Sequence, residues 1–156
     1  MLNELLLKEL HDAYSTLQHS LGVRASLDEL DAAFYVRDAI LSAGYVSPSL
    51  TQQLCARIAD IFMNWNGYLH GLVMPDPHFL VQMNESKFID SEGKKAILAL
   101  IARSMVFVSK NTLFHARGTD FAEEARFIDE SLAFWKNDYQ PTLISILETL
   151  RARWSG

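Results

Sequence analysis

Two arginines stand among apolar residues, where a guanidinium group could bind an anion. Arg37 falls on the apolar stripe of one predicted helix, and Arg103 lies within the apolar run from Ala96 to Val108. A planar guanidinium can bind a carboxylate or a phosphate through two parallel hydrogen bonds. Carboxylates of the same chain can also satisfy it, because a buried charge without a partner is costly. The sequence favours this second interpretation and predicts that Arg103 pairs with Asp60 or, failing that, with Glu85.

A second group of candidate residues surrounds the end of a predicted helix and the two prolines that follow it. Trp65 and His70 lie within this helix, and His78 follows the turn at Pro75 and Pro77. Loops held by rigid helices often carry function, and the imidazole of His70, His78 or, further along the chain, His115 could ligate haem iron. The alternative is structural, with Trp65 in the core and the prolines in an ordinary turn. The candidate ligand-binding residues are therefore Arg37, Arg103, Trp65, His70 and His78.

His115, Arg117 and Asp120 form a third group, at the junction of two predicted helices. A histidine near an aspartate can act as a general base, since imidazole titrates near neutral pH. Basic residues before a glycine and an acidic residue after it are also what the end of one helix and the start of the next require. Capping is the more ordinary interpretation, and it leaves this group without a catalytic role.

Motifs for metal and nucleotide chemistry are missing from the chain. It contains no Glu-x-x-His, no His-Glu-x-x-His and no Cys-x-x-Cys, which are spacings typical of di-iron, zinc and redox sites. It also lacks a P-loop and a Gly-x-Ser-x-Gly turn, the signatures of two large enzyme classes. We therefore expect no catalytic residue, no metal and no cofactor, and a protein that is not an enzyme.

Composition and charge restrict the class of protein further. The 156 residues carry a net charge of −5, and no segment concentrates lysine and arginine. Nucleic-acid binding is disfavoured, because a DNA-binding surface needs a positive patch. Cys55 is the single cysteine, so no internal disulfide can form, which favours a cytoplasmic protein. The amphipathic first segment has charges among its leucines and does not follow the pattern of a signal peptide.

Apolar residues recur at spacings of three and four along most of the chain, which indicates helices. Ser26 and Glu29 form a predicted capping box, and Gly22 and Gly44 are predicted to end helices. No segment has the alternating pattern of a strand. The sequence predicts an all-α, single-domain bundle spanning residues 1–156, with about six helices, two of them long and central. These helices are expected at about 2–20, 26–43, 47–72, 91–117, 120–136 and 141–154, with a break at 137–138. A short helix can restart at Asp76 and Pro77 and continue to about Met83, and the segment 84–88 is ambiguous.

The stretch 94–114 is the one around which the other helices are expected to pack. Between Ala96 and Val108 it has only two polar side chains. A helix that is apolar on nearly all sides should be covered on every side, so we expect Leu100 and Ile101 to be almost fully buried. The run is shorter than the roughly 20 apolar residues that span a bilayer, and no membrane contact is expected.

Two functions are compatible with these observations. The favoured one is a non-catalytic helical domain that acts by protein–protein interaction or by self-association, of which a homodimer is one form. The alternative is a sensor or carrier that binds an apolar, anionic or haem-like small molecule between its helices. Fold class does not choose between them, because unrelated functions share the same folds.

Overall fold

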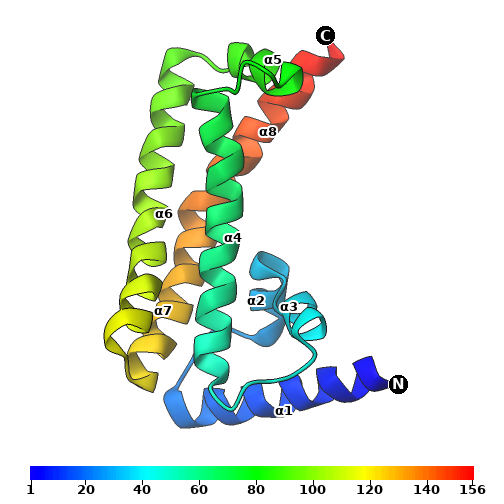
Figure 1. The fold of residues 1–156 in the computed structure, drawn as a ribbon, viewed down its shortest axis with the longest axis vertical. Coiled ribbons are helices and arrows are strands. Elements are labelled where there is room, and N and C mark those ends of the chain that lie inside the picture. The colour runs from blue at the N-terminus through cyan, green and yellow to red at the C-terminus, as the bar shows by residue number, and fades with distance from the viewer.

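The two longest helices, α4 (Leu50–Val73) and α6 (Ser91–Arg117), pack along each other and form the most extensive helix pair of the protein (Figure 1). The computed structural model describes residues 1–156 and contains only helices, turns and loops, with no strand. The predicted fold class, an all-α protein with two long central helices, is confirmed.

The remaining helices surround this pair. Helix α7 continues through a π-helical turn, η1, into α8, and together they form one long rod behind α4 in Figure 1. Helix α1 crosses the lower end of α4, α2 and α3 lie beside its lower half, and α5 packs against α4 and α8 at the upper end. Their bounds are α1 Leu2–Leu21, α2 Leu27–Phe34, α3 Val36–Ala43, α5 Leu80–Phe88, α7 Phe121–Phe134, η1 Trp135–Tyr139 and α8 Gln140–Ser155.

Helix ends occur largely where the sequence signals predicted them. The Ser26–Glu29 capping box is present in both directions. Asp120 caps α7 by accepting a hydrogen bond from the Glu123 amide at 2.7 Å. Gly22 ends α1 in the left-handed conformation, with φ of 69°. These ends are local features, because each uses only residues within a few positions of the terminus.

The predicted helix at 26–43 is wrong in one respect, because Tyr35 divides it into α2 and α3. Tyr35 has φ of 53°, a left-handed conformation that costs a non-glycine residue about 1 kcal/mol or more. Side-chain hydrogen bonds on both sides of Tyr35 support the kink. The Arg57 Nε donates to the carbonyl oxygen of Phe34 at 2.9 Å, and the Asp31 carboxylate accepts from the Arg37 amide at 2.9 Å.

The predicted break at 137–138 is also wrong, because the chain stays helical from α7 to α8. Pro141 has no amide hydrogen to donate to a carbonyl four residues earlier. In the π-helical turn before Pro141, the Gln140 amide donates to the carbonyl oxygen of Trp135, in place of the carbonyl four residues earlier that an α-helix would use. A π-turn inserts a residue without ending the helix, so the proline is accommodated within a continuous rod.

Helix α6 is buried along one face only, which corrects the expectation that every side is covered. Leu100 is almost fully buried as predicted, whereas Ile101 is only partly buried. Only 22% of the most apolar 18-residue window of α6 is buried.

The whole helix has 27 residues. Its length and composition are sufficient to cross a membrane, a test that core helices of soluble proteins also pass. The length argument against a membrane span therefore does not hold for the whole helix.

Candidate functional site: the outer face of α6

The five candidate ligand-binding residues lie apart, and none of them lines the open groove between α1 and the segment that leads into α4. Arg37 is satisfied within the chain, because its guanidinium donates to Asp28 at 2.6 Å and to Asp31 at 2.9 Å. Both carboxylates hold the pKa of Arg37 above its ordinary value, with the Asp28 hydrogen bond as the largest cause. These contacts are the pairing with carboxylates of the same chain that the second interpretation of the arginines expects.

Arg103 also pairs with a carboxylate of its own chain, but the predicted partners are wrong. Its guanidinium lies 3.3 Å from the Asp138 carboxylate and 5.1 Å from the centre of the Phe134 ring. The side chain is 56% exposed, so the pair is a surface ion pair instead of a buried one. The predicted helix break at 137–138 places no partner for Arg103 at Asp138. The continuous helix through η1 is what carries Asp138 to the flank of α6.

Trp65, His70 and His78 do not form a common site. Trp65 packs partly against the core and meets the Tyr68 ring edge to face at 6.2 Å. Both histidines are exposed, and the His78 amide donates to the Asp76 side chain in the turn after α4. The structure thus supplies ordinary contacts for Trp65 and for the turn, and it places the two imidazoles in solvent.

At the junction of α6 and α7, Asp120 is a helix cap and Arg117 pairs with Glu123 at 3.4 Å. His115 lines a very small polar pocket together with Glu124. These contacts agree with the capping interpretation of the junction. They also reveal a buried carboxyl group, Glu124, that sequence reasoning did not single out.

Glu124 is 1% exposed, and its carboxylate accepts one long hydrogen bond, at 3.3 Å, from the Thr51 hydroxyl. Burial raises the pKa of Glu124 above its ordinary value of 4.5. A raised folded-state pKa means that the folded protein holds this proton more tightly than the unfolded chain does. The stabilisation is complete below pH 4.5 and is lost as pH rises through the folded-state pKa.

Glu124→Gln should therefore raise the melting temperature at pH 7 and leave it nearly unchanged at pH 4, because glutamine keeps the shape without the charge. Glu123 is the matched control, since a hydrogen bond from Thr119 lowers its pKa. Glu123→Gln should lower the melting temperature at pH 7. Thermal unfolding at both pH values tests this. Equal shifts at pH 4 and pH 7 for Glu124→Gln would contradict it.

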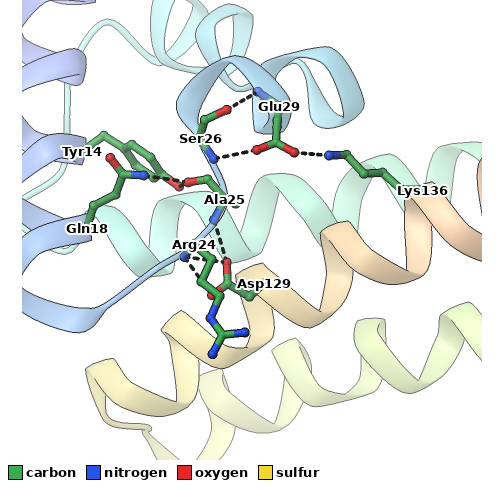
Figure 2. A network of polar contacts seen from close by, with 8 residues as sticks. All are labelled: Tyr14, Gln18, Arg24, Ala25, Ser26, Glu29, Asp129 and Lys136. Carbon is green, nitrogen blue, oxygen red and sulfur yellow. Dashed lines mark hydrogen bonds and ion pairs between the residues drawn. The ribbon is translucent and has the colours of Figure 1, made fainter.

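A polar network fixes the loop between α1 and α2 to α7 (Figure 2). The Asp129 carboxylate accepts from the backbone amides of Arg24 and Ala25 at 3.0–3.1 Å. The Ala25 carbonyl accepts from the Tyr14 hydroxyl at 2.5 Å and from the Gln18 amide at 2.9 Å. Burial raises the pKa of Tyr14. All these groups bond within the chain, so the network positions α2 and leaves little capacity for a ligand.

Glu29 extends this network across to the helical rod. Its carboxylate accepts from the Ser26 amide and pairs with Lys136 (Figure 2). The hydrogen bond from Lys136 is the largest cause of the lowered pKa of Glu29, followed by those from Ser26. The capping box was visible in the sequence, whereas Lys136 is 107 residues away and became a partner only through folding.

A buried polar trio joins α4, α6 and η1. The Asn66 side-chain amide donates to the Ser104 hydroxyl at 2.8 Å, and its oxygen accepts from the Tyr139 hydroxyl at 2.8 Å. All three residues are buried, and burial raises the pKa of Tyr139. Every member has a partner, so the trio fixes the register of α6 on α4 and forms no open site.

The exposed side of α6 carries apolar residues that these internal contacts leave largely uncovered. We define the α6 outer face as Leu98, Ala102, Met105, Val106, Ser109 and Leu113. All six are exposed, and the four large ones are 47%, 37%, 51% and 49% exposed in chain order. Single exposed apolar residues are common, but a row of them along one helix is typical of a contact surface.

Sequence reasoning missed this face because α6 is apolar on both sides. The residues of the outer face recur at helical spacing, and so do the buried Ile97, Leu100 and Ser104 on the opposite side. Periodicity identifies an apolar face when the other faces are polar. In α6 both faces are apolar, so the periodicity does not distinguish them. Only the packing of α4 shows which face is covered.

One open groove of about 520 Å³ lies elsewhere, between α1 and the segment that leads into α4. Its volume is within the range of small-molecule sites. Its only charged lining residue is Glu9, and no histidine or arginine lines it. The apolar lining residues are Ala13, Leu17, Leu21, Val46, Pro48, Leu50 and Phe121.

Comparison with known proteins finds no matching protein family, no matching curated protein and no matching solved structure.

Proposed function

We propose that this chain is a non-catalytic helical domain that acts by protein–protein contact through the α6 outer face. The single observation that carries the proposal is the uncovered apolar row from Leu98 to Leu113 on a helix whose opposite side is packed. Burial of such a row against a protein partner removes apolar surface from water, which is the main driving force of association. A cytoplasmic location is part of the proposal, because the single cysteine, Cys55, is free and buried.

The groups that could have supported a polar ligand site are already engaged. Arg37, Arg103 and Arg117 each pair with a carboxylate of the chain. Among the side chains of the α6 outer face, in contrast, Met105 accepts a hydrogen bond at its sulfur from the Asn66 amide at 3.6 Å, and the Ser109 hydroxyl bonds within α6 to the Val106 carbonyl. This contrast favours a contact surface over an anion-binding site.

Site-specific photo-crosslinking in cells tests the proposal. A photoreactive phenylalanine analogue in place of Val106 should give a discrete protein adduct. The matched control is Val81, an exposed valine on α5, which should give none. Leu98→Glu should abolish the adduct from position 106, because it places a charge within the same face. Adducts of equal yield from both positions, or none from position 106, would contradict the proposal.

The apolar groove supports a second candidate, a carrier or sensor of a small apolar molecule. Its lining lacks a basic side chain for an anion and an imidazole for haem iron, so an uncharged apolar ligand fits it best. Fluorescence of the apolar dye N-phenyl-1-naphthylamine should increase with the protein and should fall when Ala13→Trp fills the groove. An equal increase with the variant would reject this site.

A further inference from the structure

We propose that the groove between α1 and the start of α4 binds an uncharged amphiphile of the alcohol class, with its hydroxyl group at Thr51 and its apolar chain along α1. This inference rests on the second candidate function, since it names the chemical class of ligand for the same groove. It is carried by a buried polar pair at the groove wall and by the charges around that pair.

The apolar chain of such a ligand has a matching surface on α1. The segment that leads into α4 passes across this helix, and the groove lies between the two (Figure 1). Ala13, Leu17 and Leu21 line the groove at spacings of four positions. Side chains four positions apart share one face of a helix, so these three form an apolar strip about 12 Å long. An alkyl chain that lies on this strip is removed from water.

A buried polar pair stands at the wall of this otherwise apolar groove. Thr51 lines the groove and is 2% exposed, and its hydroxyl donates to the buried Glu124 carboxylate at 3.3 Å. This long bond is the only hydrogen bond of the Glu124 side chain. Buried polar groups that are incompletely bonded reduce stability. A hydroxyl oxygen has two acceptor lone pairs, so Thr51 can accept from a ligand while it donates to Glu124.

Backbone donors of α4 belong to the same wall. Helix α4 begins after Ser49, which forms no side-chain cap, and Leu50 and Thr51 of its first turn line the groove. The first amides of a helix have no acceptor within it, and no backbone carbonyl accepts from these two amides. The wall therefore offers donors and an acceptor together. A ligand hydroxyl uses both, because it accepts and donates a hydrogen bond.

The charges at this wall favour an uncharged head group. The start of α4 is the positive end of a helix dipole, which disfavours an ammonium group. Glu124 behind Thr51, and the exposed Glu9 at the groove, disfavour a carboxylate or a phosphate through like-charge repulsion. No lysine or arginine lines the groove to offset these two carboxyl groups. A hydroxyl head group avoids both penalties.

The surroundings of Glu124 agree with an uncharged ligand. Burial is the largest cause of its raised pKa, and the hydrogen bond from Thr51 acts in the opposite direction. Asp120 and Glu123 on α7 also raise the pKa, whereas His115 on α6 lowers it. A raised pKa favours the neutral carboxyl group, which needs no cation beside it.

Displacement of N-phenyl-1-naphthylamine measures the head-group preference. The probes share one alkyl chain and are 1-octanol, its methyl ether, octanoate and octylammonium. Octanol should displace the dye at a concentration about threefold or more below that of the methyl ether, the effect expected of one hydrogen bond. The ether is the more apolar of the two and cannot donate, so apolar burial alone predicts the opposite order. Octanoate and octylammonium should be weaker than octanol.

Thr51→Val tests the position of the head group, because it removes the hydroxyl with little change of shape. In this variant the advantage of octanol over its methyl ether should disappear, and Thr51→Ser, which keeps a hydroxyl, should retain it. Thr16→Val is the matched control. Thr16 also lines the groove, but it is exposed and its hydroxyl donates to the Asp12 carbonyl within α1, so the preference should remain. The probe series on the parent protein decides the head group even if Thr51→Val does not fold.

The outcomes separate this inference from the function on which it rests. Equal displacement by octanol and its methyl ether, or stronger displacement by octanoate or octylammonium, overturns the alcohol and leaves an apolar site. A preference for octanol that persists in Thr51→Val overturns the position of the head group. Dye fluorescence that does not increase with the parent protein, or that increases equally with Ala13→Trp, overturns both the groove as a binding site and this inference.

Discussion

Phe62→Ala should lower the free energy of unfolding by about 3–5 kcal/mol, the range for truncation of a large buried aromatic residue. Phe62 is fully buried on α4, at the centre of an aromatic cluster that joins four other elements. Five rings lie with their centroids 5.3–6.2 Å from the Phe62 ring, those of Phe34, Phe107, Phe134, Trp135 and Tyr139. The rings belong to rigid helices, so the cavity should not close fully, and this places the cost toward the upper end of the range.

Urea denaturation of the parent and the variant measures this effect. Phe79→Ala is the matched control, because Phe79 is largely exposed before α5 and its truncation should cost less than about 1 kcal/mol. If Phe62→Ala unfolded at the same urea concentration as Phe79→Ala, the aromatic cluster would not be the centre of the core.

Asn66→Ala should lower the free energy of unfolding by about 2–4 kcal/mol through a different mechanism. The change removes the partner of two buried hydroxyl groups, those of Ser104 and Tyr139. A buried polar group left without a hydrogen bond costs about 1–3 kcal/mol. Ser104 keeps a 2.8 Å contact with the Ile101 carbonyl, so most of the loss should come from Tyr139.

A double-mutant cycle attributes the loss. Tyr139→Phe in the Asn66→Ala background should restore part of the stability, because it removes the orphaned hydroxyl. Asn64→Ala is the control, since Asn64 is exposed two positions earlier on the same helix and should have little effect. Equal losses for Asn64→Ala and Asn66→Ala would show that the trio does not hold α6 on α4.

The positions of the helices were largely predictable from the sequence, because their ends depend on nearby residues. The Ser26–Glu29 box, the Asp120 cap and the Gly22 terminator each act within one helical turn. An all-α fold follows from the periodicity of 3.6 residues that runs through most of the chain. Local chemistry was sufficient for these features.

The errors at Tyr35 and at 137–138 have a common cause. Tyr35 adopts a left-handed conformation supported by Arg57, 22 positions away in the chain, and the helix through 137–138 relies on a π-turn ahead of Pro141. In both places tertiary packing outweighs local preference. The Arg103–Asp138 pair was missed for the same reason, because its geometry requires the π-turn.

The candidate site shows where the sequence ceased to be informative. That α6 is long and apolar was evident from its composition, whereas the side on which α4 packs was not. Leu98 and Ile97 are neighbours of equal apolar character, yet one is 47% exposed and the other is fully buried. Burial of a helix face depends on which partner reaches it, and that depends on contacts between residues far apart in the chain. Tertiary structure alone decided which apolar face of α6 is left open.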